Sequence, residues 1–168
     1  MNYLITGVSG VGKTTVAEEL AKRGYEAYDM DAVPGLTRWE DDAGKPIKPP
    51  ADPPKGWFNN HHWNWDIKKL KKIMTSSKKD KYFSGTASNQ KGHLGLFDKV
   101  FALVIDEQQL IDRLTNRTNN PFGKHPNELA DILSWHKWFE NVLVEKGAIP
   151  INGTLPVDKI VSEIINDK

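Results

Sequence analysis

Cysteine is absent from the 168 residues, which excludes disulfides, thiolate metal sites and a thiol nucleophile. Long hydrophobic runs are absent too, since no stretch approaches the roughly 18 apolar residues that a membrane span needs. The N-terminus lacks the basic and apolar segments of a signal peptide. We therefore expect no membrane partner and a soluble, cytoplasmic protein, either a monomer or a homodimer.

Charge is nearly balanced and arginine is scarce. A formal net charge of +1 argues against a nucleic-acid partner, which would normally require a strong basic excess. Four of the 23 basic residues are arginine: Arg23, Arg38, Arg113 and Arg117. Because arginine is suited to bidentate phosphate contacts, the positions of these four are informative.

Residues 7–15 fit the phosphate-binding pattern G-x-x-x-x-G-K-[ST], between an apolar strand and an amphipathic helix. Glycines let the backbone N–H groups surround a polyphosphate at the helix N-terminus. Lys13 is expected to reach the β- and γ-phosphates, Thr14 to ligate Mg²⁺ and Thr15 to bind the α-phosphate. The predicted nucleotide contacts in this loop are Gly7, Val8, Ser9, Gly10, Val11, Gly12, Lys13, Thr14 and Thr15.

Strands and helices alternate along the chain, which predicts one three-layer, doubly wound α/β domain over residues 1–168. Asp29 and Asp31 follow the expected second strand, at the sheet edge where ligands bind. We expect Asp29 to serve Mg²⁺ and Asp31 to orient an acceptor hydroxyl. The alternative is that the pair only caps the next helix.

Residues 32–63 are rich in proline and also carry several tryptophans. We predict no strand or long helix here, and either an ordered acceptor lid or a mobile flap. Arg38 is a candidate acceptor contact, or else a surface charge. The next helix is expected to open in residues 59–66, with Asn60 or Asn64 as its N-cap.

The third expected strand, 81–85, is followed by small and polar residues rather than an acid, which is why the magnesium role moves to Asp29. Asn89 and Gln90 are candidate acceptor contacts, or members of a simple polar loop. After the strand at 99–105, Arg113 and Arg117 are predicted to share a helix face and bind the transferred phosphate, beside a short lid at 117–126. Ion pairs with Glu107 or Asp112 are the alternative.

The whole chain resembles the nucleoside/nucleotide kinase-like P-loop proteins, which include adenylate, shikimate and gluconate kinases. The resemblance rests on the loop at 7–15, Y-D-M-D at 28–31, R-L-T-N-R at 113–117 and the N-N-P-F-G-K that follows it. It implies a five-stranded parallel sheet of order 2-3-1-4-5, an acceptor region after the second strand and a lid after the arginine-bearing helix.

The function expected from these features is an ATP- and Mg²⁺-dependent kinase acting on a small hydroxyl or phosphate acceptor. Lys13, Asp31, Arg113 and Arg117 are its predicted catalytic residues. Two alternatives remain open at this point: an NTPase that acts as a switch or assembly factor, and a non-catalytic nucleotide-binding module.

Overall fold

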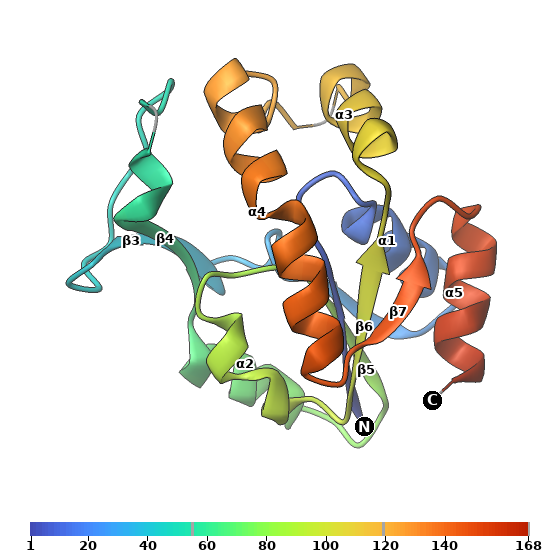
Figure 1. The fold of residues 1–168 in the computed structure, drawn as a ribbon. Helices are drawn as coiled ribbons and strands as arrows, with labels where there is room; N and C mark the ends of the chain where they lie inside the picture. Colours follow the sequence, from blue (N-terminus) through green and yellow to red (C-terminus); the bar gives the residue numbers. More distant parts are fainter. Residues whose placement is uncertain (55, 119, 168) are drawn as a thin grey trace.

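The computed structural model describes residues 1–54, 56–118 and 120–167 and is built around a five-stranded parallel sheet of order β2-β5-β1-β6-β7 (Figure 1). Numbered within this sheet alone, the strands have the predicted order 2-3-1-4-5. The α/β class and the topology are therefore confirmed. The strands are β1 (Asn2–Thr6), β2 (Glu26–Asp29), β5 (Lys81–Ser84), β6 (Lys99–Val104) and β7 (Ile149–Asn152).

Helices cover both faces of this sheet, as a parallel sheet requires. Alternate residues of the central strands face opposite layers: Ile5 packs with α1 and α5, whereas Leu4 packs with α2. α4 lies along β6, and α3 stands beside it at the carboxyl edge of the sheet (Figure 1). The helices are α1 (Lys13–Lys22), α2 (Ile67–Met74), α3 (Glu107–Asn116), α4 (Pro126–Glu145) and α5 (Val157–Asn166).

The expectation of no strand in 32–63 is wrong. β3 (Thr37–Asp41) and β4 (His61–Trp65) form an antiparallel pair that projects from the body of the molecule (Figure 1). Cross-strand packing of Trp39 on Trp63, with ring centroids 5.4 Å apart, stabilises this pair. Prolines occupy the connection between the strands, where they cost no ladder hydrogen bond.

The expected helix start is also wrong, because the residues before Asp66 are in β4. Asp66 is the N-cap of α2 and accepts a hydrogen bond from the Lys69 amide at 2.9 Å. The predicted helical spacing of apolar residues agrees with the structure only from Ile67 onward, where α2 begins. The preceding residues, His61–Trp65, instead pair with β3 as a strand.

The tip of the insertion is ordered against the rest of the protein. Phe58 packs edge-on to Phe122 and to Trp135 of α4, with centroid distances of 5.6 and 6.2 Å. Phe58 thus joins the insertion to the 117–126 segment and to α4. Trp138, also in α4, is 59% exposed. Within the described ranges, no helix is both long and apolar enough to cross a membrane.

Candidate active site

The loop before α1 has the geometry of an anion-binding helix N-terminus. Gly12 is the N-cap, in the left-handed region at φ 106°, and no side chain caps the helix. The first helical hydrogen bond runs from the Val16 amide to the Gly12 carbonyl at 3.1 Å. The amides of residues 13–15 therefore have no partner within the helix. With no acidic residue in the first turn, this end of α1 remains electropositive.

Two of the loop glycines are required by close packing as well as by conformation. A Cβ on Gly7 would lie 2.7 Å from the Leu103 carbonyl oxygen, and one on Gly10 would lie 2.9 Å from Leu114 Cδ2. The φ of Gly10 is also 95°, a value that other residues rarely adopt. The loop is thus packed directly on β6 and α3.

Lys13 points back over the loop, where its ammonium donates to the Gly7 and Val8 carbonyls at 2.8 and 2.9 Å. Burial lowers the pKa of Lys13 to about 8, against the opposing effects of Asp31 and Asp29. A lysine with a lowered pKa lacks a sufficient anionic partner. A phosphate beside it would supply the missing counter-charge.

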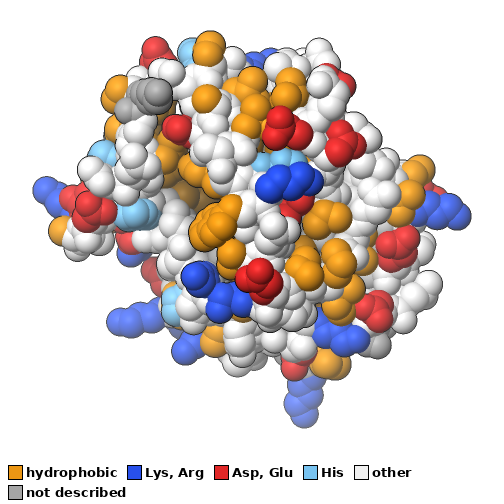
Figure 2. Space-filling view, viewed as in Figure 1, with side chains coloured by type: hydrophobic (Ala, Val, Ile, Leu, Met, Phe, Trp, Pro, Cys, Tyr) orange, Lys and Arg blue, Asp and Glu red, His pale blue; other side chains and the backbone are white. Residues whose placement is uncertain are grey.

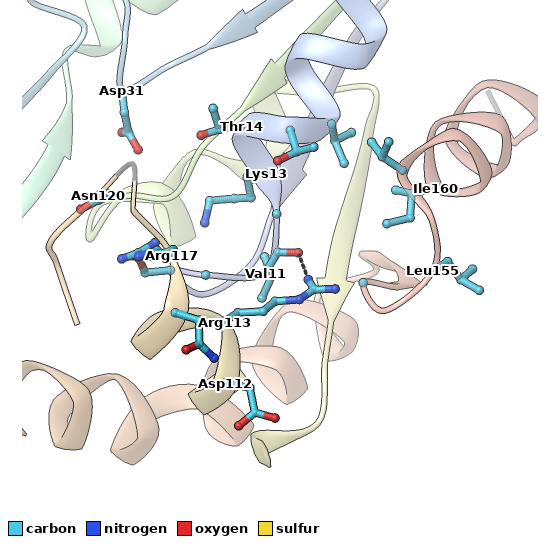
Figure 3. A pocket seen from close by; sticks show the side chains of 18 residues that line it. Val11, Lys13, Thr14, Asp31, Asp112, Arg113, Arg117, Asn120, Leu155 and Ile160 are labelled. Carbon is cyan, nitrogen blue, oxygen red and sulfur yellow. Dashed lines mark hydrogen bonds between the residues drawn. The ribbon is translucent and has the colours of Figure 1, made fainter. Parts of the chain in front are cut away.

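A cavity of about 700 Å³ runs along this loop, and Figure 3 shows its two different ends. Asp31, Asn120 and Arg117 lie at one end, whereas Leu155 and Ile160 lie at the other, with Lys13 between them (Figure 3). The described lining residues are Ser9, Gly10, Val11, Gly12, Lys13, Thr14, Thr15, Val16, Asp31, Asp112, Arg113, Asn116, Arg117, Asn120, Gly153, Leu155, Val157 and Ile160.

Asp31 reaches the cavity from the segment after β2, while Asp29 does not line it. The Trp63 indole nitrogen donates to Asp31 Oδ1 at 3.0 Å. Loss of hydration raises the pKa of Asp31, although the indole N–H and Lys13 act in the opposite direction. Asp29 accepts a hydrogen bond from the Asp31 amide at 3.0 Å, so it caps the turn that positions Asp31.

The two arginines point to different parts of the cavity (Figure 3). Arg113 Nη1 donates to the Val11 carbonyl at 3.0 Å, toward the Leu155 end. Arg117 Nη2 donates to Ser9 Oγ at 3.2 Å and to the Phe122 carbonyl of the 117–126 segment. The predicted shared helix face is wrong, because α3 ends at Asn116.

Arg117 retains capacity for a further hydrogen bond, because its Nε is buried without a partner. Burial also lowers the pKa of Arg117, with Glu128 opposing the shift. Neither Arg113 nor Arg117 forms a salt bridge with Glu107 or Asp112 among the described residues. Both guanidinium groups are therefore directed toward the phosphate-binding loop rather than toward structural ion pairs.

The end of β5 carries hydroxyl side chains where many P-loop proteins have an acidic residue. Ser84 Oγ donates to the Lys13 carbonyl at 2.7 Å, and Thr86 Oγ1 donates to the Gly7 carbonyl at 2.5 Å. Gln90 is buried and accepts from Thr6 Oγ1 at 3.1 Å. These contacts fix the backbone of the loop from the adjacent strand.

The structure does not bring three of the predicted acceptor contacts to the cavity. Arg38 binds Glu40 at 2.6 Å and Asp66 at 3.5 Å. The Asn89 side-chain amide bonds both the N–H and the carbonyl of Trp65. Gln90 belongs to the buried contacts described above, so all three side chains have structural partners.

Sequence reasoning missed the Trp63 contact to Asp31 and the apolar cavity wall at Leu155 and Ile160. Gly153 follows the last strand of the sheet, and ligands bind outside the carboxyl ends of parallel strands. That rule could have indicated the loop at 153–155. No local pattern signals the pairing of Trp63 with Asp31.

The donor set suits a magnesium ion that arrives with a nucleotide. In the described ranges, no group of three or more acidic or histidine side chains is placed to hold a metal ion. Mg²⁺ commonly takes one or two protein ligands and completes its shell with phosphate oxygens and water. The exposed Thr14 hydroxyl at the start of α1 lines the cavity and fits this limited role.

Together the fold and this loop define a P-loop protein. A family model described as an AAA domain matches residues 4–134, so the chain belongs to this P-loop family. A sequence search against curated proteins finds no match.

Several solved structures with a similar fold are small-molecule kinases. Deoxyadenosine kinase from M. mycoides with bound dATP has a TM-score of 0.57 at 16% identity, covering 99% of this chain and 98% of that one. A gluconokinase from Sinorhizobium meliloti 1021 has 0.58 at 19%, covering 98% and 89%. Shikimate kinase from Acinetobacter baumannii in complex with shikimate has 0.60 at 20%, covering 99% and 94%. The expected resemblance is confirmed at the level of the fold.

Proposed function

We propose that the protein is a phosphotransferase that moves the γ-phosphoryl group of ATP to a hydroxyl of a small acceptor. One observation carries the proposal: the phosphate-binding loop and the Asp31 carboxylate line the same cavity, with Lys13 between its two ends. A donor and an acceptor bound there would meet at the Lys13 ammonium.

The donor would lie with its base toward Leu155 and Ile160 and its phosphates along residues 9–15. The free amides at the start of α1 and the Lys13 ammonium supply positive charge for the β- and γ-phosphates. Arg113 points toward the base end of this arrangement. Arg117, with its unpaired Nε, is directed to the end where the γ-phosphate would be transferred.

Transfer requires positioning and charge neutralisation more than covalent help. The acceptor oxygen forms a bond to the γ-phosphorus, and the bond from this phosphorus to the β,γ-bridging oxygen breaks, so that ADP leaves. Asp31 orients the acceptor hydroxyl and receives its proton, and its raised pKa makes it a better base. Thr14 would hold a Mg²⁺ ion, which would supply positive charge to help neutralise the triphosphate.

The test is ADP release from ATP in the presence of a panel of hydroxyl and phosphate acceptors. We expect at least one acceptor to accelerate ADP release, and Asp31→Asn to remove that acceleration while ATP affinity is retained. Asp112→Asn is the matched control, because Asp112 lines the same cavity but lies near Arg113, away from the transfer end.

Two results would contradict the proposal. ATP hydrolysis at the same rate with and without every acceptor would favour an NTPase. ATP binding without any turnover would favour a non-catalytic module. A loss of ATP affinity in Asp31→Asn would instead move Asp31 from acceptor binding to the donor site.

A further inference from the structure

We infer that the acceptor is an uncharged alcohol carrying a flat ring, a chemical class to which nucleosides belong, rather than a phosphorylated or carboxylated metabolite. This inference rests on the proposed phosphotransferase function and narrows its acceptor. Two independent observations carry it: the distribution of cations around Asp31 and the aromatic cluster that contacts it.

The cations that line the cavity are all placed for the donor. Among the described lining residues they are Lys13, Arg113 and Arg117. A nucleoside triphosphate with Mg²⁺ still carries net negative charge, which Lys13 and Arg117 would neutralise, while Arg113 points toward the base end of the donor. No described lining cation remains for a second anion at the Asp31 end.

Several described basic side chains around the hairpin are paired or turned away. Arg38 and Trp39 are neighbours in β3, so their side chains leave opposite faces of the hairpin. Trp39 is paired with Trp63, which contacts Asp31, and Arg38 therefore faces away from the carboxylate. On that far face Arg38 is neutralised by Glu40.

The histidines and one lysine in the same region have partners as well. His62 lies 2.8 Å from Asp42, and His125 lies 3.7 Å from Asp52. The Lys69 ammonium donates to the Pro34 carbonyl. Among the described residues, the cations nearest Asp31 in the cavity are thus Lys13 and Arg117, which the proposed donor phosphates would occupy. An anionic acceptor would then meet the Asp31 carboxylate and the γ-phosphate together, an arrangement that disfavours binding.

An aromatic wall begins at Asp31 itself. Its Oδ1 accepts from Trp63, whose ring is 5.4 Å from that of Trp39. Trp39 in turn packs against Phe58 at 5.6 Å, and Phe58 packs against Phe122 at 5.6 Å. These four rings form a continuous aromatic cluster, the aromatic wall, between the acceptor carboxylate and the 117–126 segment.

The aromatic wall is linked to both sides of the transfer end. Arg117 donates to the Phe122 carbonyl at one end, and Trp63 holds Asp31 at the other. The four rings of the wall are each half-buried rather than fully enclosed. On the face shown in Figure 2, hydrophobic side chains gather in the recess between the projecting hairpin and α4. None of the four rings lines the cavity itself, but the wall is partly exposed and is joined to Asp31 through Trp63, so it suits an acceptor whose flat ring extends beyond the carboxylate.

The first test compares matched acceptors by ADP release at saturating ATP. Adenosine, cytidine and thymidine are each paired with their 5′-monophosphates, and gluconate, shikimate and glycerol complete the set. We expect kcat/KM for at least one nucleoside to exceed that of every anionic acceptor and of glycerol by about tenfold or more. An anionic acceptor that equals or exceeds the nucleosides overturns the charge argument. Equal use of glycerol overturns the ring argument.

The second test uses the wall itself. Trp39→Leu removes a ring without touching Asp31, so acceptor KM should rise by about tenfold while the KM for ATP is unchanged. Trp138→Leu is the matched control, because Trp138 is an exposed tryptophan of α4 outside the wall. Trp39→Phe keeps a ring and should fold and retain most acceptor affinity if Trp39→Leu proves unstable. An unchanged acceptor KM in Trp39→Leu would refute the proposed role of the aromatic wall in acceptor binding.

Calorimetric titration of nucleosides into the wild-type protein, with and without ATP, separates this inference from the proposed function. Nucleoside binding without ADP release would refute phosphotransfer but retain the uncharged, ring-bearing ligand. ADP release with an anionic acceptor, and no nucleoside binding, would retain phosphotransfer and refute the inference.

Discussion

The protonation of Lys13 should control ATP binding at mildly alkaline pH. Its pKa is lowered from 10.5 to about 8 by burial, and only the charged ammonium can pair with phosphate. At pH 9 about a tenth of such a lysine is protonated, whereas nearly all of an ordinary lysine is. The protonated fraction falls from about one half at pH 8, so the dissociation constant for ATP should increase about fivefold between pH 8 and pH 9, equivalent to about 1 kcal/mol.

Bound triphosphate restores the charged form, so ATP binding above pH 8 should take up a proton. Isothermal titration calorimetry in two buffers of different ionisation enthalpy measures this uptake directly. Lys13→Arg is the control, because a guanidinium remains charged throughout this range and should give a flat pH profile. A wild-type affinity that stays constant from about pH 7 to pH 9.5, or a Lys13→Arg profile that falls in parallel, would refute the reasoning.

The lowered pKa of Lys13 should weaken ATP binding at alkaline pH, but it should make the nucleotide-free protein more stable as the pH rises. In the nucleotide-free protein the folded pKa lies below the unfolded one, so between pH 8 and 10.5 the unfolded state binds more protons at this site. The free energy of unfolding should then rise with pH by up to about 3 kcal/mol from Lys13. Urea titrations should show this slope in the wild type and lose it in Lys13→Met.

Three further predictions concern the loop and the acceptor carboxylate. Gly10→Ala should lower the free energy of unfolding by about 2–3 kcal/mol, because the new Cβ would lie 2.9 Å from Leu114 at a φ of 95°. Gly44→Ala is the control, since Gly44 has a φ of 74° and no neighbour within 4 Å. It should lower the free energy of unfolding by only about 1 kcal/mol in the same urea titration. Thr86→Val removes a hydrogen bond to the loop and should raise the KM for ATP severalfold, about 1 kcal/mol, whereas Thr86→Ser should restore it. Because burial raises the pKa of Asp31, kcat should fall on acidification at a higher pH than for an ordinary aspartate, and stopped assays that find no such limb would contradict its role as base.

Sequence patterns predicted the parallel sheet well because they report local and periodic requirements. The apolar strand at 99–104 needs burial on both faces, and the glycines at 7–12 need a backbone that only glycine adopts easily. Neither requirement depends on distant residues. The phosphate-binding loop and the parallel α/β class could therefore be predicted before any coordinates, whereas the strand order was implied by the family resemblance.

The acceptor side could not be predicted in this way. Arg38 was a reasonable acceptor contact until the pairing of β3 with β4 placed it on the far face of the hairpin, beside Glu40. Asn89 was an equally reasonable candidate, but in the structure its side-chain amide is hydrogen-bonded to the backbone of Trp65. Both outcomes depend on the pairing of β3 with β4 and on the position of β4 beside the residues that follow β5. The proline-rich sequence of the insertion gives no local pattern that indicates this pairing.

The chain by itself thus determined a P-loop and the parallel sheet that supports it, since each follows from backbone freedom and side-chain periodicity within about ten residues. Only the tertiary structure decided that Trp63 would hold Asp31 and that Arg113 and Arg117 would point to different ends of one cavity. The physical reason is distance along the chain: these contacts join residues 32 to 108 positions apart. Packing of complete elements, rather than local preference, brings them together.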